Sequence, residues 1–464
     1  MMLSEISKAV GGQLIGHDVG MHGVLCESVG SDSRNIVKSQ LFVAIKGEHF
    51  DGNSFATEAI KQGAAAVLVS DLNTQASPAV LVQDTRLALG QMAKYWRDKF
   101  QIPLVAITGS NGKTTVKEML AAILKAADKN ALATQGNLNN DIGMPMTLLK
   151  LRAEHDVAVI EMGMNHMGEI DYLTHIAQPN IAVINNAGTA HIGELGSRDN
   201  IAKAKGEIFA GLSDDGVAVI NADDEYADYW KSLNKNTKTI MFGMQSQADL
   251  SATFVEKESI SEVTLYTPKG NIVFNLAMLG KHNISNALAA SACAVALGVS
   301  NADIARGLES FTTVKGRLQR KIGVNGAALI DDTYNANPDS MKAAIDVLAA
   351  MQNNTIFVMG DMAELGADAM QMHIDIGAYA KQKGIQTLFT FGENSQLASQ
   401  AFGANAQHFA SIDSLVTSLK LIMQANTTLL VKGSRFMQME RVIQLIELNS
   451  IEEKSITKKM MEDA

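Results

Sequence analysis

The feature that most constrains the fold is a glycine-containing loop between an apolar strand and a helix. The segment IPLVAIT (102–108) leads into the loop GSNG (109–112), after which apolar residues recur at helical spacing. In such a unit, glycines let backbone N–H groups converge on a phosphate, and the helix N-terminus adds a favourable dipole. Lys113 supplies a point charge, and the Thr114 hydroxyl can reach Mg²⁺. This pattern predicts an α/β domain that binds ATP or GTP, although an ordinary strand-to-helix turn with a surface lysine shares the local sequence.

Short apolar runs alternate with helix-length segments along most of the chain. Strands that are apolar on both faces and alternate with helices are typical of a parallel sheet covered on both sides. The expected strands are 41–45, 64–69, 102–108, 157–160, 181–184, 217–220, 327–332, 355–360, 387–392 and 428–433. The sequence therefore predicts the α/β class.

Three domains are expected, at 1–84, 85–313 and 314–450, followed by a tail at 451–464. A chain of 464 residues suits that number, since domains average about 150 residues. Between 249 and 279 the pattern changes to alternation around a Pro-Lys-Gly turn, which indicates antiparallel strands. We expect them to form an edge ribbon on the central sheet.

Composition excludes several classes of protein. The net charge of −10 argues against a broad nucleic-acid or anionic-membrane surface. The two cysteines, Cys26 and Cys293, form no ligand-spaced pair, so neither a disulfide framework nor a zinc site is indicated. No apolar stretch reaches the roughly 18 residues of a membrane span, and no secretory leader pattern is visible. We expect a cytoplasmic protein, by default a monomer, that binds neither nucleic acid nor membranes.

Further candidates for a metal-dependent phosphate site lie along the central region. Glu161 ends an apolar strand, where a carboxylate faces the crevice at the strand ends. His191 follows the next strand and its loop, and Lys203 and Lys205 share a helix on which at most one can face the site. Each also has a plain structural interpretation, as a solvated acid, a structural histidine or a solvated lysine.

Taken together, these residues and their surroundings resemble the Mur ligase superfamily over nearly the whole chain. The superfamily's shortened loop TGSNGKTT (108–115) accounts for the two residues between the first glycine and the Gly-Lys pair, where the usual Walker A pattern has four. Further matches are GNLNNDIGMP (136–145), EMGMNHMGEI (161–170), NNAGTAHIGELGS (185–197), AKAKGEIF (202–209), LGKHNISNALAA (279–290), KGRLQ (315–319), DDTYNANPDSM (331–341), MGDMAELG (359–366) and VKGSR (431–435).

The resemblance implies an architecture and two cofactors. A central parallel-sheet P-loop ATPase domain would be flanked by an N-terminal α/β domain for a UDP-sugar and a C-terminal Rossmann-like domain for the incoming amine. ATP and Mg²⁺ would serve the central site. Because some of the implied ATP contacts follow the central domain in sequence, productive binding would require domain closure.

The resemblance also implies roles for individual residues. The ATP-binding set would be Gly109, Ser110, Asn111, Gly112, Lys113, Thr114, Thr115, His282, Asn283, Asn286, Arg317, Asp332 and Tyr334. The magnesium ligands would be Thr114, Glu161, His191 and Lys205, with Lys205 carbamylated, and the catalytic set would be Lys113, Glu161, His191 and Lys205. The UDP-sugar set would be Ser33, Arg34, Lys46, Gly47, Asp51, Asn53, Thr134, Asn137, Asn139 and Asn140. Candidates for the amine substrate are Asn335, Asn337 and Asp361.

The activity implied is ATP-dependent amide ligation in peptidoglycan precursor synthesis, and hence in cell wall biogenesis, cell shape and cell division. The motifs are most similar to members that add D-alanyl-D-alanine to UDP-N-acetylmuramoyl tripeptide through an acyl phosphate. Alternatives are another Mur-type ligase or a folylpolyglutamate synthase, although the Asp-Asn-Pro-Arg motif of the diaminopimelate-adding type is absent. Two other classes are a phosphoryl-transfer kinase and a non-catalytic nucleotide-binding protein.

Overall fold

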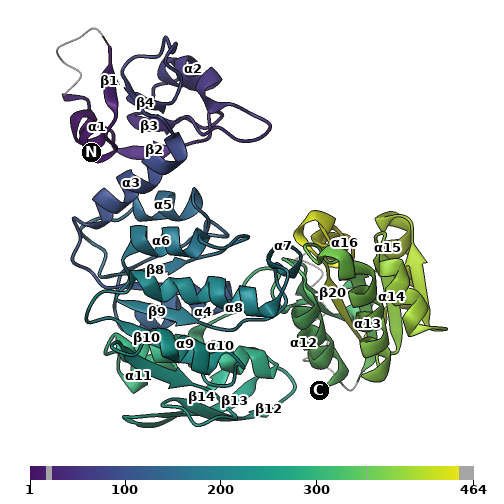
Figure 1. Cartoon of the computed structure of the whole chain (residues 1–464). Helices are drawn as coiled ribbons and strands as arrows, with labels where there is room; N and C mark the ends of the chain where they lie inside the picture. The colour runs from purple at the N-terminus through teal and green to yellow at the C-terminus, as the bar shows by residue number, and fades with distance from the viewer. Residues whose placement is uncertain (17–22, 352, 449–464) are drawn as a thin grey trace.

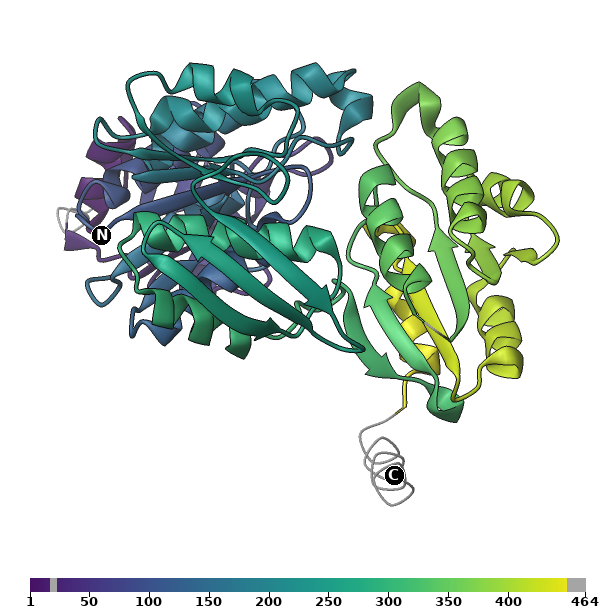
Figure 2. The same cartoon turned by 90° about the horizontal axis from the view of Figure 1, so that it is seen from below.

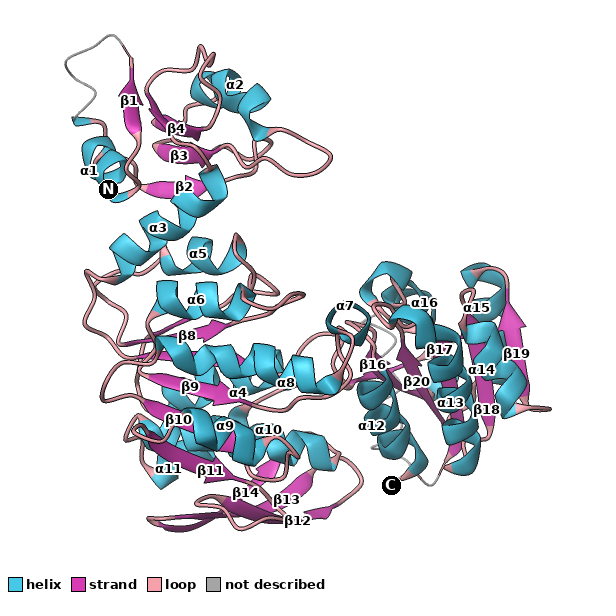
Figure 3. Cartoon of the chain, viewed as in Figure 1, coloured by secondary structure: helices cyan, strands magenta, loops and turns pink. Residues whose placement is uncertain are grey.

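The computed structural model describes residues 1–16, 23–351 and 353–448. Three α/β bodies follow one another along the chain, with the first stacked on the second and the third beside the second (Figure 1). The sheets are largely parallel with helices on their faces, so the α/β class is confirmed (Figure 3). The tail expected at 451–464 lies outside the described residues.

The N-terminal body is a five-stranded sheet of short strands in the order β1-β5-β4-β3-β2. All neighbouring pairs are parallel except β1 with β5. Its elements are α1 (Leu3–Ala9), β1 (Gln13–Ile15), β2 (Ser28–Gly30), β3 (Gln40–Val43), a 3₁₀ turn (Gly52–Phe55), α2 (Ala56–Lys61), β4 (Ala66–Val69) and β5 (Ala79–Leu81). Only β3 and β4 stand out in the sequence, because three-residue strands are too short to show periodicity.

Helix α3 (Thr85–Arg97) joins the first body to the second. Asp84 begins it as the N-cap, and Leu89 on its buried face packs into an apolar cluster that also contains Leu41 of β3 and Ile160 of the central sheet. One core therefore runs through both bodies. The domain boundary expected at 84 stays a prediction.

The central body is built on a six-stranded, all-parallel sheet in the order β11-β10-β9-β6-β8-β7. Strand β6 lies between β9 and β8. The strands that follow β6 in the sequence are added first on its β8 side and then on its β9 side, and this switch leaves a crevice at the carboxyl end of β6. The strands are β6 (Leu104–Thr108), β7 (Ala131–Ala133), β8 (Val157–Glu161), β9 (Ile181–Ile184), β10 (Val217–Asn221) and β11 (Lys238–Phe242). The helices are α4 (Lys113–Ala126), α5 (Gly143–Leu148), α6 (Glu169–Ala177), α7 (Ile192–Leu195), α8 (Arg198–Gly206), α9 (Ala227–Leu233), α10 (Lys281–Ala296) and α11 (Asn301–Ser310), with a 3₁₀ turn at Glu207–Gly211.

The antiparallel strands predicted within 249–279 exist, but the expectation that they form an edge ribbon on the central sheet is wrong. Strands β12 (Ser251–Glu256), β13 (Ser261–Thr267) and β14 (Gly270–Leu276) form a separate three-stranded sheet. Alternate residues of β13, including Val263 and Leu265, are buried in the same cluster as α10 and α11. A sheet with one apolar face must cover it, and here two helices provide the cover.

The C-terminal body is a six-stranded sheet in the order β15-β16-β20-β17-β18-β19, parallel except for β15. Its strands are β15 (Gln319–Ile322), β16 (Ala328–Asp332), β17 (Asn354–Gly360), β18 (Thr387–Phe391), β19 (Ala406–Phe409) and β20 (Thr427–Lys432). Its helices are α12 (Pro338–Ala349), α13 (Ala369–Gln382), α14 (Ser395–Phe402), α15 (Ile412–Ile422) and α16 (Glu440–Ile446), with 3₁₀ turns at Val324–Gly326, Gly366–Asp368 and Arg435–Met437. The first three helices pack on one face of the sheet and the last two on the other, which is the expected Rossmann-like arrangement.

The C-terminal body stands beside the central body as a distinct layered unit when seen from below (Figure 2). Its two apolar clusters contain only residues from 318 onward, so it shares no core with the central sheet. Within the described part of the chain, no helix combines the length and apolar character that crossing a bilayer requires.

The cap of α3 provides a test of how the first two bodies are joined. The Asp84 carboxylate accepts hydrogen bonds from the backbone N–H groups of Arg86 (2.7 Å) and Leu87 (3.0 Å). We expect Asp84→Ala to lower the free energy of unfolding by about 1 kcal/mol, whereas Asp84→Asn, which keeps an acceptor, stays within about 0.5 kcal/mol of wild type. Chemical denaturation followed by the fluorescence of the two tryptophans, of which Trp96 lies on α3, measures both. Equal losses in the two variants would contradict the capping role.

Candidate active site

A cavity of about 740 Å³ lies between the central and C-terminal bodies. Its walls come from the loop after β6, the ends of β8 to β10, the start of α10, and the segment from β16 to α12. In open α/β sheets the carboxyl ends of the strands are where ligands bind. The cavity is therefore the candidate active site.

The phosphate loop is held in shape by backbone contacts to the neighbouring strand end. The N–H of Ser110 donates to the Asn186 carbonyl (3.0 Å), and the N–H of Asn111 donates to Asn186 Oδ1 (2.9 Å). Gly112 adopts a left-handed conformation, φ 80°, immediately before α4, and a Cβ there would collide with the side-chain amides of Asn286 and Asn185. Glycine is needed at this position because both the backbone angle and the space exclude a side chain.

Two cations of the site come from different bodies. Lys113 Nζ donates to the Gly109 carbonyl (2.7 Å), and burial, reinforced by nearby Arg317, lowers the pKa of Lys113. Arg317 Nη2 donates to Thr114 Oγ1 (3.0 Å), and its guanidinium lies 4.2 Å from the centroid of the Tyr334 ring. The Arg317 Nε is buried without a hydrogen-bond partner in the described structure. A buried unused donor beside a phosphate loop fits an anionic ligand such as the phosphates of ATP.

Glu161, at the end of β8, is 2% exposed and is held from several directions. Its Oε2 accepts from Thr114 Oγ1 (2.9 Å) and its Oε1 from Asn139 Nδ2 (2.7 Å). The Glu161 N–H donates to Thr134 Oγ1 (2.9 Å). A hydroxyl and a carboxylate beside a phosphate loop are oxygen ligands of the kind Mg²⁺ takes.

Magnesium needs few protein side chains to hold it. Among the described residues, no group of three or more His, Cys, Asp or Glu side chains is arranged to hold a metal. Mg²⁺ commonly takes one or two carboxylates and completes its shell with substrate phosphates and water. Thr114 and Glu161 match that pattern.

His191 lies at the junction with the C-terminal body. It adopts a left-handed conformation, φ 64°, before the short helix α7, and its Nδ1 lies 2.7 Å from Glu364 Oε2 of the C-terminal body. This contact lowers the pKa of the Glu364 carboxyl. The N–H of Gly193 donates to the Glu364 carbonyl (2.9 Å), so the two bodies touch through backbone as well as side chains.

The two candidate lysines of α8 differ sharply in environment. Lys203 is exposed, whereas Lys205 is 2% exposed, and its side-chain nitrogen Nζ makes no hydrogen bond or ion pair with any described residue. Burial, together with the charge of Lys113, places the pKa of Lys205 well below its usual value, although Asp224 opposes the shift. The surroundings of Lys205 therefore stabilise its charged form less than bulk water does.

Polar side chains at the start of α10 connect to the loop. Asn283 Nδ2 donates to the Leu279 carbonyl (2.8 Å), Asn286 Nδ2 to Asn283 Oδ1 (3.2 Å), and Asn185 Nδ2 to Asn286 Oδ1 (2.8 Å). Beside them, burial lowers the pKa of His282 to about 4, so its imidazole is neutral at pH 7. His282, Asn283 and Asn286 line the cavity and offer neutral donors and acceptors to a ligand.

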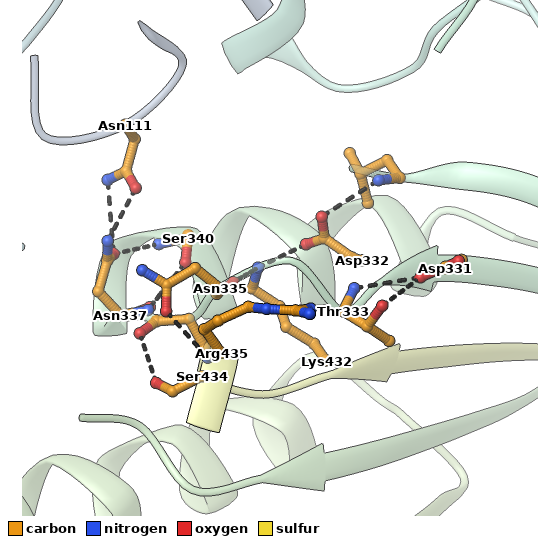
Figure 4. A network of polar contacts seen from close by, with 12 residues as sticks. Asn111, Asp331, Asp332, Thr333, Asn335, Asn337, Ser340, Lys432, Ser434 and Arg435 are labelled. Atoms are coloured by element: carbon orange, nitrogen blue, oxygen red, sulfur yellow. Dashed lines mark hydrogen bonds and ion pairs between the residues drawn. The ribbon is translucent and has the colours of Figure 1, made fainter. Parts of the chain in front are cut away.

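The C-terminal body contacts the phosphate loop through the start of α12 (Figure 4). Asn337 Nδ2 donates to Asn111 Oδ1 (2.8 Å), and Asp339 Oδ2 accepts from the Thr189 N–H (2.7 Å) and hydroxyl (2.9 Å). Deeper in the same body, buried Lys432 lies 2.6 Å from Asp332, its register partner on the adjacent strand. The third body therefore reaches the loop with polar groups.

Most, though not all, of the residues expected in the site line the cavity. Those that do are Ser110, Asn111, Gly112, Lys113, Thr115, Asn137, Asn139, Asn140, Glu161, His191, His282, Asn283, Asn286, Arg317, Asp332, Tyr334, Asn335 and Asn337. Gly109, Thr114 and Lys205 lie behind this wall. Thr134, expected on the sugar-peptide path, is 1% exposed and supports the Glu161 backbone.

Other expected residues lie away from the cavity. Asp361 accepts hydrogen bonds from the N–H groups of Asn394 (3.2 Å) and Ser395 (2.7 Å) at the start of α14, so it orders the C-terminal body. The UDP-sugar candidates of the first body, which do not line the cavity, are Ser33, Arg34, Lys46, Gly47, Asp51 and Asn53. Among them, Lys46 Nζ lies 3.8 Å from Asp51 Oδ2 on an exposed loop.

Several residues that line the cavity were not predicted as site residues from the sequence. They are Asp224, Asp339, Glu364, Lys432 and Arg198. Lys432 ends β20 and Asp224 closely follows β10, so the strand-end rule applied to Glu161 would have found both. Glu364 and Asp339 are placed by the packing of two bodies, which no local pattern reports.

Fold and site together define a phosphate-loop nucleotide-binding protein whose third body completes the site. Three family models match the chain: "Mur ligase family, catalytic domain" at 26–97, "Mur ligase middle domain" at 107–294, and "Mur ligase, glutamate ligase domain" at 316–435. The UDP-N-acetylmuramoyl-tripeptide--D-alanyl-D-alanine ligase of Escherichia coli (strain K12) is 43% identical over 451 residues, covering 96% of this chain and 98% of that protein. The chain belongs to the Mur ligase family.

Solved structures agree over the full architecture. Crystal structure I of MurF from Acinetobacter baumannii gives a TM-score of 0.88 at 37% identity, covering 95% of this chain and 97% of that one. The MurF ligase from Thermotoga maritima in complex with ADP gives a TM-score of 0.82 at 27% identity, covering 91% of this chain and 97% of that one. The resemblance inferred from the motifs is confirmed.

Gly112 provides a test of the loop. We expect Gly112→Ala to weaken ATP binding by about tenfold or more, because left-handed strain alone costs about 1–2 kcal/mol and the methyl group also meets two amides. Gly298→Ala is the matched control, since Gly298 has φ 79° and nothing within 4 Å of its Cβ position. Isothermal titration with a non-hydrolysable ATP analogue should show unchanged affinity in the control. Equal affinity in both variants would remove the loop from nucleotide binding.

Proposed function

We propose that this chain is an ATP-dependent ligase that joins D-alanyl-D-alanine to UDP-N-acetylmuramoyl tripeptide. The observation that carries the proposal is the constellation of Lys113, Thr114, Glu161 and Arg317 around one phosphate loop, in a chain 43% identical to a ligase of that name. The reaction would serve peptidoglycan precursor synthesis in the cytoplasm. We assign the three tasks to 1–84 for the UDP-sugar, 85–313 for ATP and 314–450 for the dipeptide.

The first chemical step brings two anions together. The terminal carboxylate of the tripeptide attacks the γ-phosphate of ATP, forming an acyl phosphate and releasing ADP. Loop amides and Lys113 hold the β- and γ-phosphates, while Arg317 brings a second positive charge from the C-terminal body. Thr114, Glu161 and His191, with modified Lys205, would hold magnesium. That metal supplies charge neutralisation at the phosphoryl oxygens.

The second step forms the amide bond. The free amine of D-alanyl-D-alanine attacks the acyl-phosphate carbonyl, a proton leaves the nitrogen, and phosphate departs with its electron pair. Asn335 and Asn337 are the candidates for holding the dipeptide, since both line the cavity beside the phosphate loop. The main task here is positioning, because holding the amine against the carbonyl replaces a bimolecular encounter.

The ligation assay tests this proposal directly. With Mg-ATP, UDP-N-acetylmuramoyl tripeptide and D-alanyl-D-alanine, phosphate release should require both acceptors, and mass spectrometry should detect the pentapeptide product. Lys113→Ala should reduce turnover by at least about a hundredfold, since it removes a transition-state charge contact. Phosphate left on an acceptor as the end product would instead identify a kinase, and equal release without the dipeptide would refute the ligase.

We further propose that Lys205 is carbamylated in the active enzyme. After the ammonium group loses one proton, the amine nitrogen would attack CO₂, forming an N–C bond and releasing a second proton. The side chain would then be an anion able to help hold magnesium. The burial of Lys205 and the lack of a described partner for its Nζ support this assignment over exposed Lys203.

The carbamate makes activity depend on dissolved CO₂. In bicarbonate-free buffer, ligation should fall about tenfold and recover when bicarbonate is added, since losing a metal-site contact typically costs that much or more. Lys205→Ala should be inactive but partly rescued by short carboxylates, whereas Lys203→Ala should match wild type. Full activity of Lys205→Ala without bicarbonate would overturn the assignment.

A further inference from the structure

A second lysine of α4 is buried completely, and neither the loop chemistry nor the proposed reaction uses it. Lys117 lies four residues after Lys113, one helical turn further along α4, and is 0% exposed. It does not line the cavity. Burying an ammonium group costs free energy unless the group is hydrogen-bonded and paired, so its contacts indicate what it stabilises.

The contacts of Lys117 lead toward the metal-binding carboxylate. Lys117 Nζ donates to the backbone carbonyl of Thr134 (2.5 Å), just beyond the end of β7. The Thr134 N–H donates to the Val159 carbonyl (3.0 Å) on β8, and Thr134 Oγ1 accepts from the Glu161 N–H (2.9 Å). Thr134 therefore accepts a hydrogen bond from Lys117 and, through its hydroxyl, holds the carboxyl end of β8, where Glu161 lies.

These hydrogen bonds end at Glu161, the proposed magnesium ligand. The two carboxylate oxygens of Glu161 accept hydrogen bonds from Thr114 and Asn139, but these bonds hold only the side chain. Its backbone N–H is held by Thr134 alone among the contacts described. A shift of Thr134 would therefore move Glu161 relative to Thr114, which lies on the same helix as Lys117.

We propose that Lys117 is a positioning residue that holds Glu161 in place for magnesium through Thr134. The proposal rests on the proposed function for the identity of the metal-nucleotide ligand. Helix α4 then carries three groups for the same ion and its phosphates: Lys113 for the phosphates, Thr114 for the metal, and Lys117 for the carboxylate opposite. Because all three lie within two turns of one helix, the loop and the carboxylate keep a fixed separation.

The charged end of Lys117 also contacts Glu118, whose Oε1 lies 2.7 Å from Nζ. That carboxylate is about 40% exposed, so water screens the pair. If Lys117 served only to pair with Glu118, Glu118→Gln would reproduce the effects of losing the lysine. If it acts through Thr134, Glu118→Gln should leave the metal site unchanged.

The test measures metal binding rather than turnover. Mn²⁺ replaces Mg²⁺ as the probe, and electron paramagnetic resonance gives its dissociation constant in the presence of ADP. Lys117→Met keeps the length of the side chain but removes the donor, and it should weaken Mn²⁺ binding to the ADP complex by about tenfold, as losses of outer-shell partners usually do. ADP binding in EDTA should stay within about twofold of wild type, because the loop is untouched.

Matched variants separate positioning from simple structural support. Lys125→Met makes the same change at an exposed position of α4, and Glu118→Gln removes the ion pair; both should bind Mn²⁺ as wild type does. Thr134→Val keeps a β-branched shape but removes the acceptor for the Glu161 N–H, so it should also weaken Mn²⁺ binding by about tenfold. If Lys117→Met does not fold, the Mn²⁺ affinity of Thr134→Val tests the proposal instead.

The double variant Lys117→Met/Thr134→Val tests whether Lys117 acts through Thr134. If Lys117 works through Thr134, Lys117→Met should add little to the loss already caused by Thr134→Val. Fully multiplied losses, wild-type Mn²⁺ affinity in Lys117→Met, or weakened metal-free ADP binding to the same extent would each overturn the proposal. Since none of these measurements requires ligation, a chain that fails the ligase assay can still support or refute the role of Lys117.

Discussion

The site depends on the hydrogen bond between the Thr114 hydroxyl and the Glu161 carboxylate. It joins the first turn of α4 to the end of β8, and it exists because β6 and β8 are neighbours in a parallel sheet. Parallel pairing brings the ends of both strands to the same edge of the sheet, so the phosphate loop and the Glu161 carboxylate lie close together. Substrate phosphates and magnesium would meet at this bond.

The apolar clusters do not follow the division of the chain into three bodies. The first two bodies share one core, in which residues of β3, α3 and the central sheet belong to the same cluster. The C-terminal body has cores of its own and meets the central body through polar contacts such as Asn337 with Asn111 and Glu364 with His191. Polar interfaces of this kind favour relative motion of domains. The first two bodies therefore form a platform, and the third is the part suited to opening and closing.

Local sequence patterns predicted most of the features that depend on neighbours within a few residues. These are the phosphate loop, the buried strands and Glu161 at a strand end, and the family motifs extended the prediction to residues such as Arg317. Prediction failed for very short strands such as β1 and β5, whose three residues carry no periodicity. It also misplaced the β12–β14 ribbon, since alternation shows that one face is buried but not against which element.

Long-range packing accounts for the residues that sequence reasoning missed. Glu364 lies 173 positions beyond His191 and meets it only when the third body is docked. The family resemblance implied that Thr134 lies on a substrate path with Asn137 and Asn139. Those two residues line the cavity, whereas the Thr134 hydroxyl accepts a hydrogen bond from the Glu161 backbone. Sequence motifs mark a segment as functional but cannot show which side of it faces the ligand.

Partly buried cations help explain how a chain of net charge −10 can receive two polyanionic ligands. Lys113 and Arg317 both line the cavity, and burial lowers the pKa of Lys113 because a charged amine is poorly solvated there. A buried donor without a hydrogen-bond partner costs free energy of folding, and Arg317 Nε is such a donor among the described residues. Phosphates entering the cavity would satisfy these donors, so part of the binding free energy comes from relieving a cost already built into the fold. The same poor solvation keeps water from screening the contacts, which makes a few placed cations sufficient where a broad basic surface is absent.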